Sequence, residues 1–492
     1  MQKAIYFSVF MVSLLVCPSC TAHDSDLTDA IEEGNTESII VDNLPNVPQN
    51  AFYKDVFLDA GVGLTSRKFL YAADYLGLFT EGISFSASNA SDEEIALQNR
   101  IIGGDQNDTN GRLLYPDGQP RFRLLFVNGG SSTTHGSSLS KRALDNMKQF
   151  VLNGGSYVGT CAGAFFASCG YDDNTNYPNY LSLWPSTINH TGISNTTTGM
   201  FIEPDSPLLN YYEFGGDIYV ADIRHNGGGY PVDLPPQTEV LALYDYPSKT
   251  DVHLQPSVWT YKDNEYTGRV IMEGSHPEEV AIGELRDLTA SMILYAVDGV
   301  GATTLKGNLK NGEPRLMIKR TEDNDPLFTR IGDLQCHHFV FELPEHANII
   351  RIEVNSSVDC DLQLAVCHST FAYPEDADYV SPSIGSHQQL FFSELSSGKW
   401  FVTVKCHTTI AVTETEYGQS YTDNVDVLNG IPYEIVASWE EGNREALDIA
   451  VNGNTLKPSS KRRYYGLSGK TYHTHPHPLH SVFIRGGRKY VR

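Results

Sequence analysis

The stretch GGSYVGTCAGAFFAS, residues 154–168, decides the fold of the first half of the chain. Its pattern is typical of a short apolar strand, a tight turn and the start of a helix. Cys161 lies at the turn, and its neighbours are as small as a sharp strand-to-helix turn requires: Gly159, Ala162, Gly163 and Ala164. At a helix start the dipole favours a thiolate. The alternative is that Cys161 is a small buried residue, and this stretch alone does not decide between the two.

Strands and helices alternate on both sides of this stretch, from about residue 52 to residue 300. KDVFLDAGVG (54–63) and RFRLLFVNGG (121–130) are typical of strands that end in glycine turns. SLSKRALDNMKQFVLNGG (138–155) is typical of an amphipathic helix with a glycine C-cap. This alternation predicts an α/β fold with a parallel sheet covered on both faces and with ligands near the carboxyl ends of its strands.

A partner for the cysteine occurs in GRVIMEGSHPEE, residues 268–279, where His276 and Glu278 follow an apolar strand and a Gly-Ser turn. Their spacing lets the imidazole act as a base while the carboxylate orients and charges it, as in nucleophile–base–acid triads. The alternative is a plain turn with both polar side chains in water. Cys169, two helical turns after Cys161, is expected to be packed.

Other polar residues near the expected strand ends are weaker candidates. The Asn-Gly-Gly-Gly run at 226–229 could line a pocket, because glycine lets a backbone approach a ligand, or it could be a tight turn. Arg224 and His225 could bind a substrate carboxylate, and the alternative is a solvated strand end. His135, in a Ser/Thr-rich loop, is expected at the surface.

Together, the Cys161 stretch, FVNGG (126–130), IRHNGGGY (223–230) and GSHPE (274–278) resemble the class I glutamine amidotransferase-like superfamily, most closely the branch of the biotin-protein ligase N-terminal domain. The resemblance implies a flavodoxin-like parallel sheet with a nucleophile elbow. It implies Cys161 as nucleophile, His276 as base and Glu278 as orienting acid, without a metal or cofactor. It also implies six residues that line the oxyanion or substrate site: Gly129, Gly130, Ala162, Asn226, Gly227 and Gly228. Neither amidotransfer nor biotinylation follows, because no acceptor-synthetase or biotin-ligase catalytic motif is recognised.

Composition and the first residues constrain the partners. Sixty Asp and Glu residues against 35 Lys and Arg give a net charge of -25, which argues against nucleic acid and anionic lipid. Residues 1–22 are typical of an export signal, with Lys3 before the apolar run AIYFSVFMVSLLV. Cleavage after Ala22 and lipidation of Cys20 both remain open. We therefore expect a secreted or outer-surface protein that meets a membrane only through an anchor at Cys20.

The pattern changes after about residue 305 to short alternating runs with polar turns, which predict an antiparallel β-sandwich. DCDLQLAV (359–366) and LSSGKWFVTVKC (395–406) resemble pre-peptidase C-terminal domains of secreted enzymes. Because an exported chain permits disulfides, we expect two bridges, in any of three pairings, among four cysteines. These are Cys336, Cys360, Cys367 and Cys406.

The last segment is basic, with nine Lys or Arg and no Asp or Glu from Lys457 onward. Its YYGLSGKTY and FIRGGRKYVR runs resemble C-terminal sorting segments of Bacteroidota secreted proteins, which implies cell-surface secretion machinery as a partner. The expected division is a signal peptide at 1–22, an amidotransferase-like domain at 45–303, a β-sandwich at 310–442 and a sorting tail at 446–492.

These patterns favour an exported cysteine hydrolase that acts on an amide or peptide-like bond. The alternatives are a non-catalytic cell-surface binding protein that keeps the fold, and an adhesin in which the first domain is only a scaffold.

Overall fold

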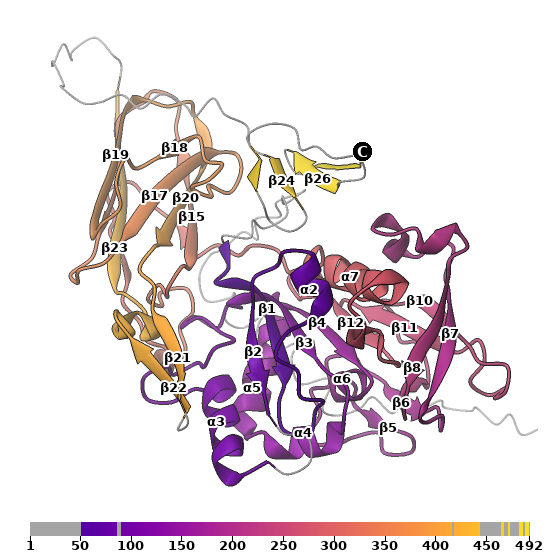
Figure 1. The fold of residues 1–492 in the computed structure, drawn as a ribbon. Coiled ribbons are helices and arrows are strands. Elements are labelled where there is room, and N and C mark those ends of the chain that lie inside the picture. The colour runs from indigo at the N-terminus through magenta and orange to yellow at the C-terminus, as the bar shows by residue number, and fades with distance from the viewer. Residues whose placement is uncertain are drawn as a thin grey trace, which may run out of the picture.

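The computed structural model describes residues 51–85, 90–415 and 418–442, together with four short strands between residues 464 and 491. The expected signal at 1–22 and most of the expected tail at 446–492 lie outside the described residues. Figure 1 shows an α/β body, which runs from β1 to α7, and a sandwich body, which runs from β13 to β23. None of the helices in the described ranges is both long enough and apolar enough to cross a membrane.

A mixed nine-stranded sheet forms the centre of the α/β body, in the order β2-β1-β3-β4-β12-β11-β10-β7-β8. The first five strands in this order are parallel. They are β1 (Lys54–Ala60), β2 (Thr80–Ser84), β3 (Phe122–Val127), β4 (Ser156–Thr160) and β12 (Val270–Glu273). The other four are antiparallel: β7 (Thr196–Ile202), β8 (Tyr219–His225), β10 (Thr238–Asp245) and β11 (Pro256–Tyr261).

The predicted α/β fold with a parallel sheet is therefore confirmed for the first five strands of this sheet. It is wrong for the other four strands, which are antiparallel. The reason lies in the connections, because parallel neighbours need a crossover of about a dozen residues, usually a helix. Between β7 and β12 the only helical elements of the chain are the short 3-10 turns η2 (Pro207–Asn210) and η3 (Phe214–Gly216). Without a crossover helix, these strands pair antiparallel.

Helices cover both faces of the parallel strands, as expected. On one face, α3 (Asp92–Gly103), α5 (Lys141–Leu152) and α6 (Ala162–Ala167) pack on strand residues such as Phe57, Leu125 and Tyr157. On the other face, α2 (Tyr71–Tyr75) and α7 (Gly283–Val297) pack on Val56, Phe126 and Val158. Alternate residues of one strand thus enter two different cores, which is why these strands are apolar throughout.

Smaller elements complete this body. They are α4 (Ser132–Ser138), the 3-10 turn η4 (Pro277–Glu279) and a three-stranded sheet of β5 (Gly170–Tyr171), β6 (Thr187–His190) and β9 (Gly229–Pro231).

The sandwich body has two sheets with a common apolar core. One contains β13 (Gly307–Asn308), β15 (Cys336–Leu343), β17 (Leu362–His368), β18 (Tyr379–Val380) and β20 (Gly398–Cys406). The other contains β14 (Arg315–Met317), β16 (Ala347–Asn355), β19 (His387–Glu394) and β23 (Tyr433–Glu441). All these pairs are antiparallel except β13 with β15, so the expected antiparallel character holds for the rest.

Other short elements occur in this half of the chain. They are η5 (Thr321–Asp323), η6 (Val425–Asn429), the hairpin of β21 (Ala411–Thr415) and β22 (Gly418–Thr422), and a sheet of β24 (Tyr464–Gly466), β25 (Thr471–Tyr472), β26 (Val482–Arg485) and β27 (Arg488–Val491).

The expectation of two disulfides is wrong for this structure, in which the four late cysteines are free thiols. Strand register gives the reason. Cys336 lies opposite Lys405 and Cys367 lies opposite Phe401, both outside the sandwich core. Cys360 and Cys406 instead belong to the core between the sheets. No late cysteine faces another directly across a strand pair.

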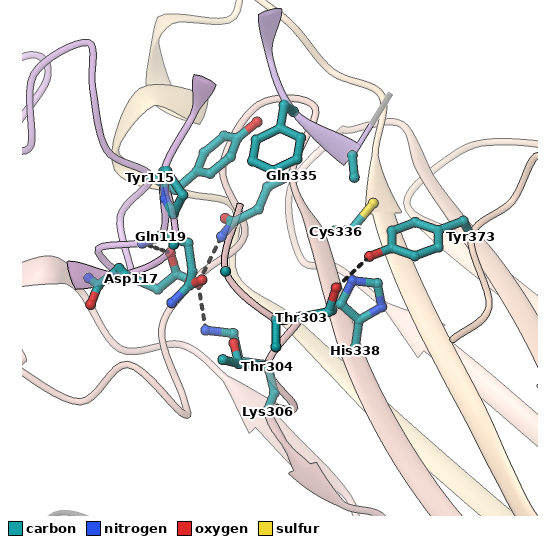
Figure 2. A pocket seen from close by; sticks show the side chains of 17 residues that line it. Tyr115, Asp117, Gln119, Thr303, Thr304, Lys306, Gln335, Cys336, His338 and Tyr373 are labelled. Carbon is teal, nitrogen blue, oxygen red and sulfur yellow. Dashed lines mark hydrogen bonds and ion pairs between the residues drawn. The ribbon is translucent and has the colours of Figure 1, made fainter. Parts of the chain in front are cut away.

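The two bodies meet through charged residues that are buried between them. Asp117 accepts a hydrogen bond from Gln335 Nε2 at 2.8 Å and pairs with Lys306 Nζ at 2.5 Å. Figure 2 shows these side chains at a pocket between the bodies that Cys336, His338 and Tyr373 also line. Nearby, Arg121 and Asp333 form a fully buried ion pair at 2.6 Å. Buried charges of this kind are stable only while both partners are present.

Removing one member of the Arg121–Asp333 pair should therefore destabilise the whole chain. We expect Asp333→Asn to lower the free energy of unfolding by about 3–5 kcal/mol, because it leaves the guanidinium buried without its counter-charge. Asp145→Asn, which breaks the exposed pair with Lys141, is the matched control and should cost less than about 1 kcal/mol. Urea unfolding measures both. Similar losses of unfolding free energy in the two variants would show that the buried Arg121–Asp333 pair matters no more than an exposed pair.

Candidate active site

Cys161 occupies the sharp turn between β4 and α6 that the sequence predicts. Its φ of 48° and ψ of -104° are costly for a residue with a side chain. The Cys161 N–H donates to the Glu273 carbonyl at 2.7 Å, which ties the turn to the end of β12. A Cβ on Gly159 would lie 2.4 Å from the Gly163 carbonyl carbon, and one on Gly163 would lie 2.3 Å from the Val127 oxygen. The small neighbours are therefore required by the close packing of this turn.

His276 reaches Cys161 because β12 lies beside β4 in parallel register. Its Nδ1 lies 3.2 Å from Glu278 Oε1, and the imidazole lies close enough to Cys161 for the charges of the two groups to interact. Gly129, just past β3, makes room for this arrangement. A Cβ there would lie 2.2 Å from His276 Cε1 and 3.3 Å from Cys161 Cβ. Four of the predicted site residues thus meet at the carboxyl ends of three neighbouring strands.

The electrostatics of His276 favour a charged ring. Burial alone lowers its pKa, but the interactions of the ring with the Cys161 sulfur and the Glu278 carboxylate outweigh burial and raise the pKa to about 11. Cys161 is 4% exposed, His276 6% and Glu278 2%, so little water screens these charges. An imidazolium beside a cysteine sulfur is the arrangement that stabilises a thiolate.

Two other predicted residues, Ala162 and Gly130, have backbone N–H groups near the turn that contains Cys161. Ala162 is the first residue of α6, where an N–H has no partner within the helix. Gly130 lies opposite Leu64 in an antiparallel bridge that is closed by the N–H groups of Thr65 and Ser131. The N–H of Gly130 itself therefore points away from Leu64.

The 226–229 segment lies against both the sulfur and the histidine turn. The Asn226 carbonyl is 3.8 Å from Cys161 Sγ. A Cβ on Gly228 would lie 1.6 Å from the Gly274 oxygen, so only glycine permits this contact. Gly227 has a φ of 77°, and a Cβ there would touch no neighbour. A positive φ of this kind is typical of a glycine in a turn. Of the three predicted residues, Asn226 thus contacts Cys161 directly.

Two of the weaker expectations for histidines are wrong. His225 is buried, with Nε2 2.7 Å from Thr191 Oγ1 and Nδ1 2.9 Å from Ser275 Oγ. Burial, and then the charge of His276, lower its pKa to about 4, so it is neutral and neither binds a carboxylate nor lies at a solvated strand end. His135 is also fully buried, on α4, with Nε2 3.2 Å from Asp59 Oδ2. Cys169 is buried, as expected.

Sequence reasoning missed three charged residues at this site, namely Arg67, Glu273 and Glu279. Arg67 lies 3.7 Å from Glu279, which also pairs with Arg224. The Glu273 carboxylate accepts the Ser275 N–H at 2.6 Å. Burial, reinforced by the charge of Glu278 and opposed by the Ser275 hydrogen bond, raises the pKa of Glu273 to about 8. An acidic residue at the end of the otherwise apolar run VIME was the available signal.

Among the described residues, one group has the spacing of metal ligands. Donor atoms of His276, Glu278 and Glu279 lie within 4.8 Å of one another. However, the Glu279 carboxylate is paired with two arginines, and His276 is engaged with Cys161 and Glu278. These charges fit a cation poorly.

The chain is similar to one protein family by sequence. The family model described as "Biotin-protein ligase, N terminal" matches residues 116–177, which include Gly129, Gly130, Cys161 and Ala162. The biotin-protein ligase of Schizosaccharomyces pombe is 24% identical over an alignment of 265 positions, which covers 45% of this chain and 40% of that ligase. The expected resemblance to the biotin-protein ligase N-terminal domain is thereby confirmed, although this chain matches less than half of the ligase.

Two solved structures show a weaker likeness. A putative ThuA-like protein from Bacteroides uniformis is 14% identical, with 50% of this chain and 92% of that chain covered, at a TM-score of 0.30. The pre-peptidase C-terminal domain of a Bacillus anthracis collagenase is 12% identical, with 28% and 100% covered, at a TM-score of 0.18. Scores this low do not establish a common fold.

The buried carboxyl of Glu273 should make stability depend on pH. Its raised pKa means that the folded state holds the proton more tightly than the unfolded state, so this contribution is lost as the pH rises toward about 8. Glu273→Gln, which cannot ionise, should gain stability relative to wild type between about pH 5 and pH 8. Thermal unfolding across this range measures the difference. If the stability of wild type and the stability of Glu273→Gln change in parallel across this pH range, Glu273 does not titrate within it.

Proposed function

We propose that the α/β body is a flavodoxin-like cysteine hydrolase that cleaves an amide or peptide-like bond, with Cys161 as nucleophile, His276 as base and Glu278 as orienting acid. The observation that carries the proposal is the position of His276, whose Nδ1 lies 3.2 Å from the Glu278 carboxylate and whose ring, like Cys161, lies against Gly129. The similarity of residues 116–177 to the biotin-protein ligase N-terminal family supports the cysteine turn. It does not extend to His276.

In the proposed reaction, the thiolate of Cys161 attacks the carbonyl carbon of the substrate. A C–S bond forms, and the carbonyl π electrons move to oxygen, which faces the amides of Gly129, Gly130 and Ala162. As the carbonyl re-forms, the C–N bond breaks and the leaving amine takes the proton from the His276 imidazolium. The products of this half are a free amine and a thioester on Cys161.

Water completes the cycle. Neutral His276 takes a proton from a water molecule while the water oxygen attacks the thioester carbon, which gives a second tetrahedral intermediate. Collapse of this intermediate breaks the C–S bond. The carboxylic acid leaves, and the thiolate–imidazolium pair is restored. Glu278 keeps the ring oriented and stabilises its charge in both halves.

One observation favours a binding protein as the second candidate. Cys161 is only 4% exposed, and its thiol also lies near the Asn226 carbonyl. A buried cysteine of this kind is compatible with a fold that binds a ligand without turnover. Reactivity of the thiol separates the two candidates.

The proposed location is the secreted or outer-surface compartment, and it rests on the sequence alone. The apolar run after Lys3 supports an exported chain, with a lipid anchor at Cys20 as the variant form. The basic tail at 446–492 supports a sorting or anchoring role of the kind found in Bacteroidota. A pre-peptidase-like spacing or binding role for the sandwich body completes the proposal.

The first test measures thiol reactivity. Iodoacetamide should modify Cys161 faster than the equally buried Cys169, and the rate at neutral pH should depend on His276, because the imidazolium stabilises the thiolate. In His276→Ala the rate should be lower at neutral pH and should rise with pH as it does for an ordinary thiol. Mass mapping of the alkylated peptides gives both rates. An unchanged pH profile would remove His276 from the mechanism and favour the binding protein.

The second test measures turnover with a panel of amides and γ-glutamyl compounds. His276→Ala should lower kcat about as far as Cys161→Ala, because members of a catalytic unit are not additive. Glu278→Gln should cost less, since the amide keeps a hydrogen-bond partner for the ring and loses only the charge. Mild effects from all three changes would mean that the His-Pro-Glu segment is only a turn.

A further inference from the structure

We propose that His135 is a positioning residue for the reaction at Cys161, because it holds in place the segment whose backbone amides face the oxyanion. This inference rests on the proposed function, in which Gly129 and Gly130 supply two of those amides. It starts from a buried histidine on α4 that the proposed reaction does not use.

Two backbone segments at the carboxyl ends of neighbouring parallel strands are involved. The strap, residues 61–65, follows β1, and the oxyanion segment, residues 128–131, follows β3. His135 contacts the strap, and the strap contacts the oxyanion segment. The argument for a positioning role therefore has two links, one for each of these contacts.

The strap is bound to the oxyanion segment through backbone groups. The Thr65 N–H donates to the Gly129 carbonyl at 2.8 Å. The Ser131 N–H donates to the Gly63 carbonyl, also at 2.8 Å. A Cβ on Gly130 would lie 2.6 Å from the Gly63 oxygen, so the two segments touch without spare room. A displacement of the strap would therefore displace the amides of the oxyanion segment.

Two buried side chains hold Val62 of the strap from opposite sides. His135 Nδ1 lies 3.1 Å from the Val62 carbonyl oxygen, and because a carbonyl only accepts, this ring nitrogen carries a proton and donates. The Val62 N–H donates to Gln98 Oε1 at 2.7 Å. His135 and Gln98 are both fully buried. Since a buried backbone group without a partner is destabilising, these two side chains fix the position of Val62.

The imidazole of His135 is itself held on two further sides. Its Nε2 lies 3.2 Å from Asp59 Oδ2, and Asp59 Oδ1 accepts the Gly61 N–H of the strap at 2.9 Å. Its ring packs edge-on against Phe166 of α6, with the ring centroids 4.9 Å apart. His135 thus connects β1, the strap and the helix that starts after Cys161, so it can set the position of the strap relative to the sulfur.

The consequence for the reaction is confined to steps that form an oxyanion. Hydrogen-bond donors that are fixed before the reaction stabilise the developing negative charge, and small misplacements of such groups slow the reaction strongly. The thiolate, in contrast, is stabilised by His276. Replacing His135 should therefore impair attack on a carbonyl more than it impairs the thiolate itself.

Two reagents that react differently with Cys161 test this inference. With p-nitrophenyl acetate, the thiolate attacks the carbonyl carbon, the π electrons move to oxygen, and p-nitrophenolate leaves as the acetyl thioester forms. With iodoacetamide, the thiolate displaces iodide from a CH2 carbon, and no oxyanion forms. The measured quantity is the ratio of the rate constants for acylation and alkylation at Cys161, relative to the same ratio for free cysteine.

We expect this relative ratio to exceed one in wild type, because the oxyanion segment assists acylation alone. In His135→Ala the ratio should fall about tenfold, which is less than the loss of roughly 10²–10³ in kcat when an oxyanion donor is removed outright. The alkylation rate should stay close to that of wild type. In His135→Asn most of the ratio should return, because the amide nitrogen can donate to the Val62 carbonyl in place of Nδ1.

His338→Ala is the matched control, because it removes another buried histidine with a hydrogen bond, in the sandwich body. Its ratio should equal that of wild type. If His135→Ala does not fold, Gln98→Met is the second variant. It keeps an unbranched side chain of similar size but removes the acceptor of the Val62 N–H, so it should also lower the ratio.

The outcomes separate this inference from the proposed function. An unchanged ratio in His135→Ala or Gln98→Met, whether the two rate constants stay the same or fall together, would overturn the positioning role. A wild-type ratio equal to that of free cysteine would also overturn it, while leaving Cys161 as a reactive nucleophile. Failure of wild-type Cys161 to react with iodoacetamide would instead contradict the proposed hydrolase.

Discussion

The pairing of β4 with β12 is the constraint on which the candidate site depends. Thr160 lies opposite Glu273 in parallel register, and the next N–H along, that of Cys161, donates to the Glu273 carbonyl at 2.7 Å. One backbone hydrogen bond thus ties the cysteine turn to the strand that carries His276. A shift of one residue in this register would move the imidazole away from the sulfur and turn the strand's side chains toward the opposite core.

Around this pairing, the site is built by close backbone approach more than by side-chain packing. Gly129, Gly163 and Gly228 each lie where a Cβ would collide with the histidine ring or with a neighbouring backbone. The buried neutral His225 then bridges Thr191 and Ser275, which holds the turn before His276. The geometry of the candidate site is therefore supported by polar and glycine contacts that are specific to single positions.

The cysteine turn and its histidine partner could be predicted from the sequence because both are local patterns. Small residues around Cys161 indicate a sharp turn, and a strand followed by Gly-Ser-His-Pro-Glu indicates where a histidine could lie beside it. The direction of β7, β8, β10 and β11 could not be predicted in the same way, because their apolar runs do not encode strand direction. Only the absence of long helices between them carried that information.

Burial of polar residues was the other property that local patterns did not show. His135 appeared to belong to a surface loop, yet it is buried against Asp59, which belongs to a strand far earlier in the chain. The late cysteines appeared suited to pairing, yet all four are free thiols, two in the sandwich core and two outside it. Partners of this kind are set by tertiary structure, and no spacing along the chain reveals them.

The charged contact between the two bodies limits how such a protein can be rearranged in evolution. Arg121 of the α/β body pairs with Asp333 of the sandwich side, and Asp117 of the α/β body pairs with Lys306 and accepts a hydrogen bond from Gln335. A recombination event that exchanged the sandwich for an unrelated module would leave Arg121 and Asp117 without partners at the new junction. The two bodies are therefore expected to be inherited together, as one unit of selection.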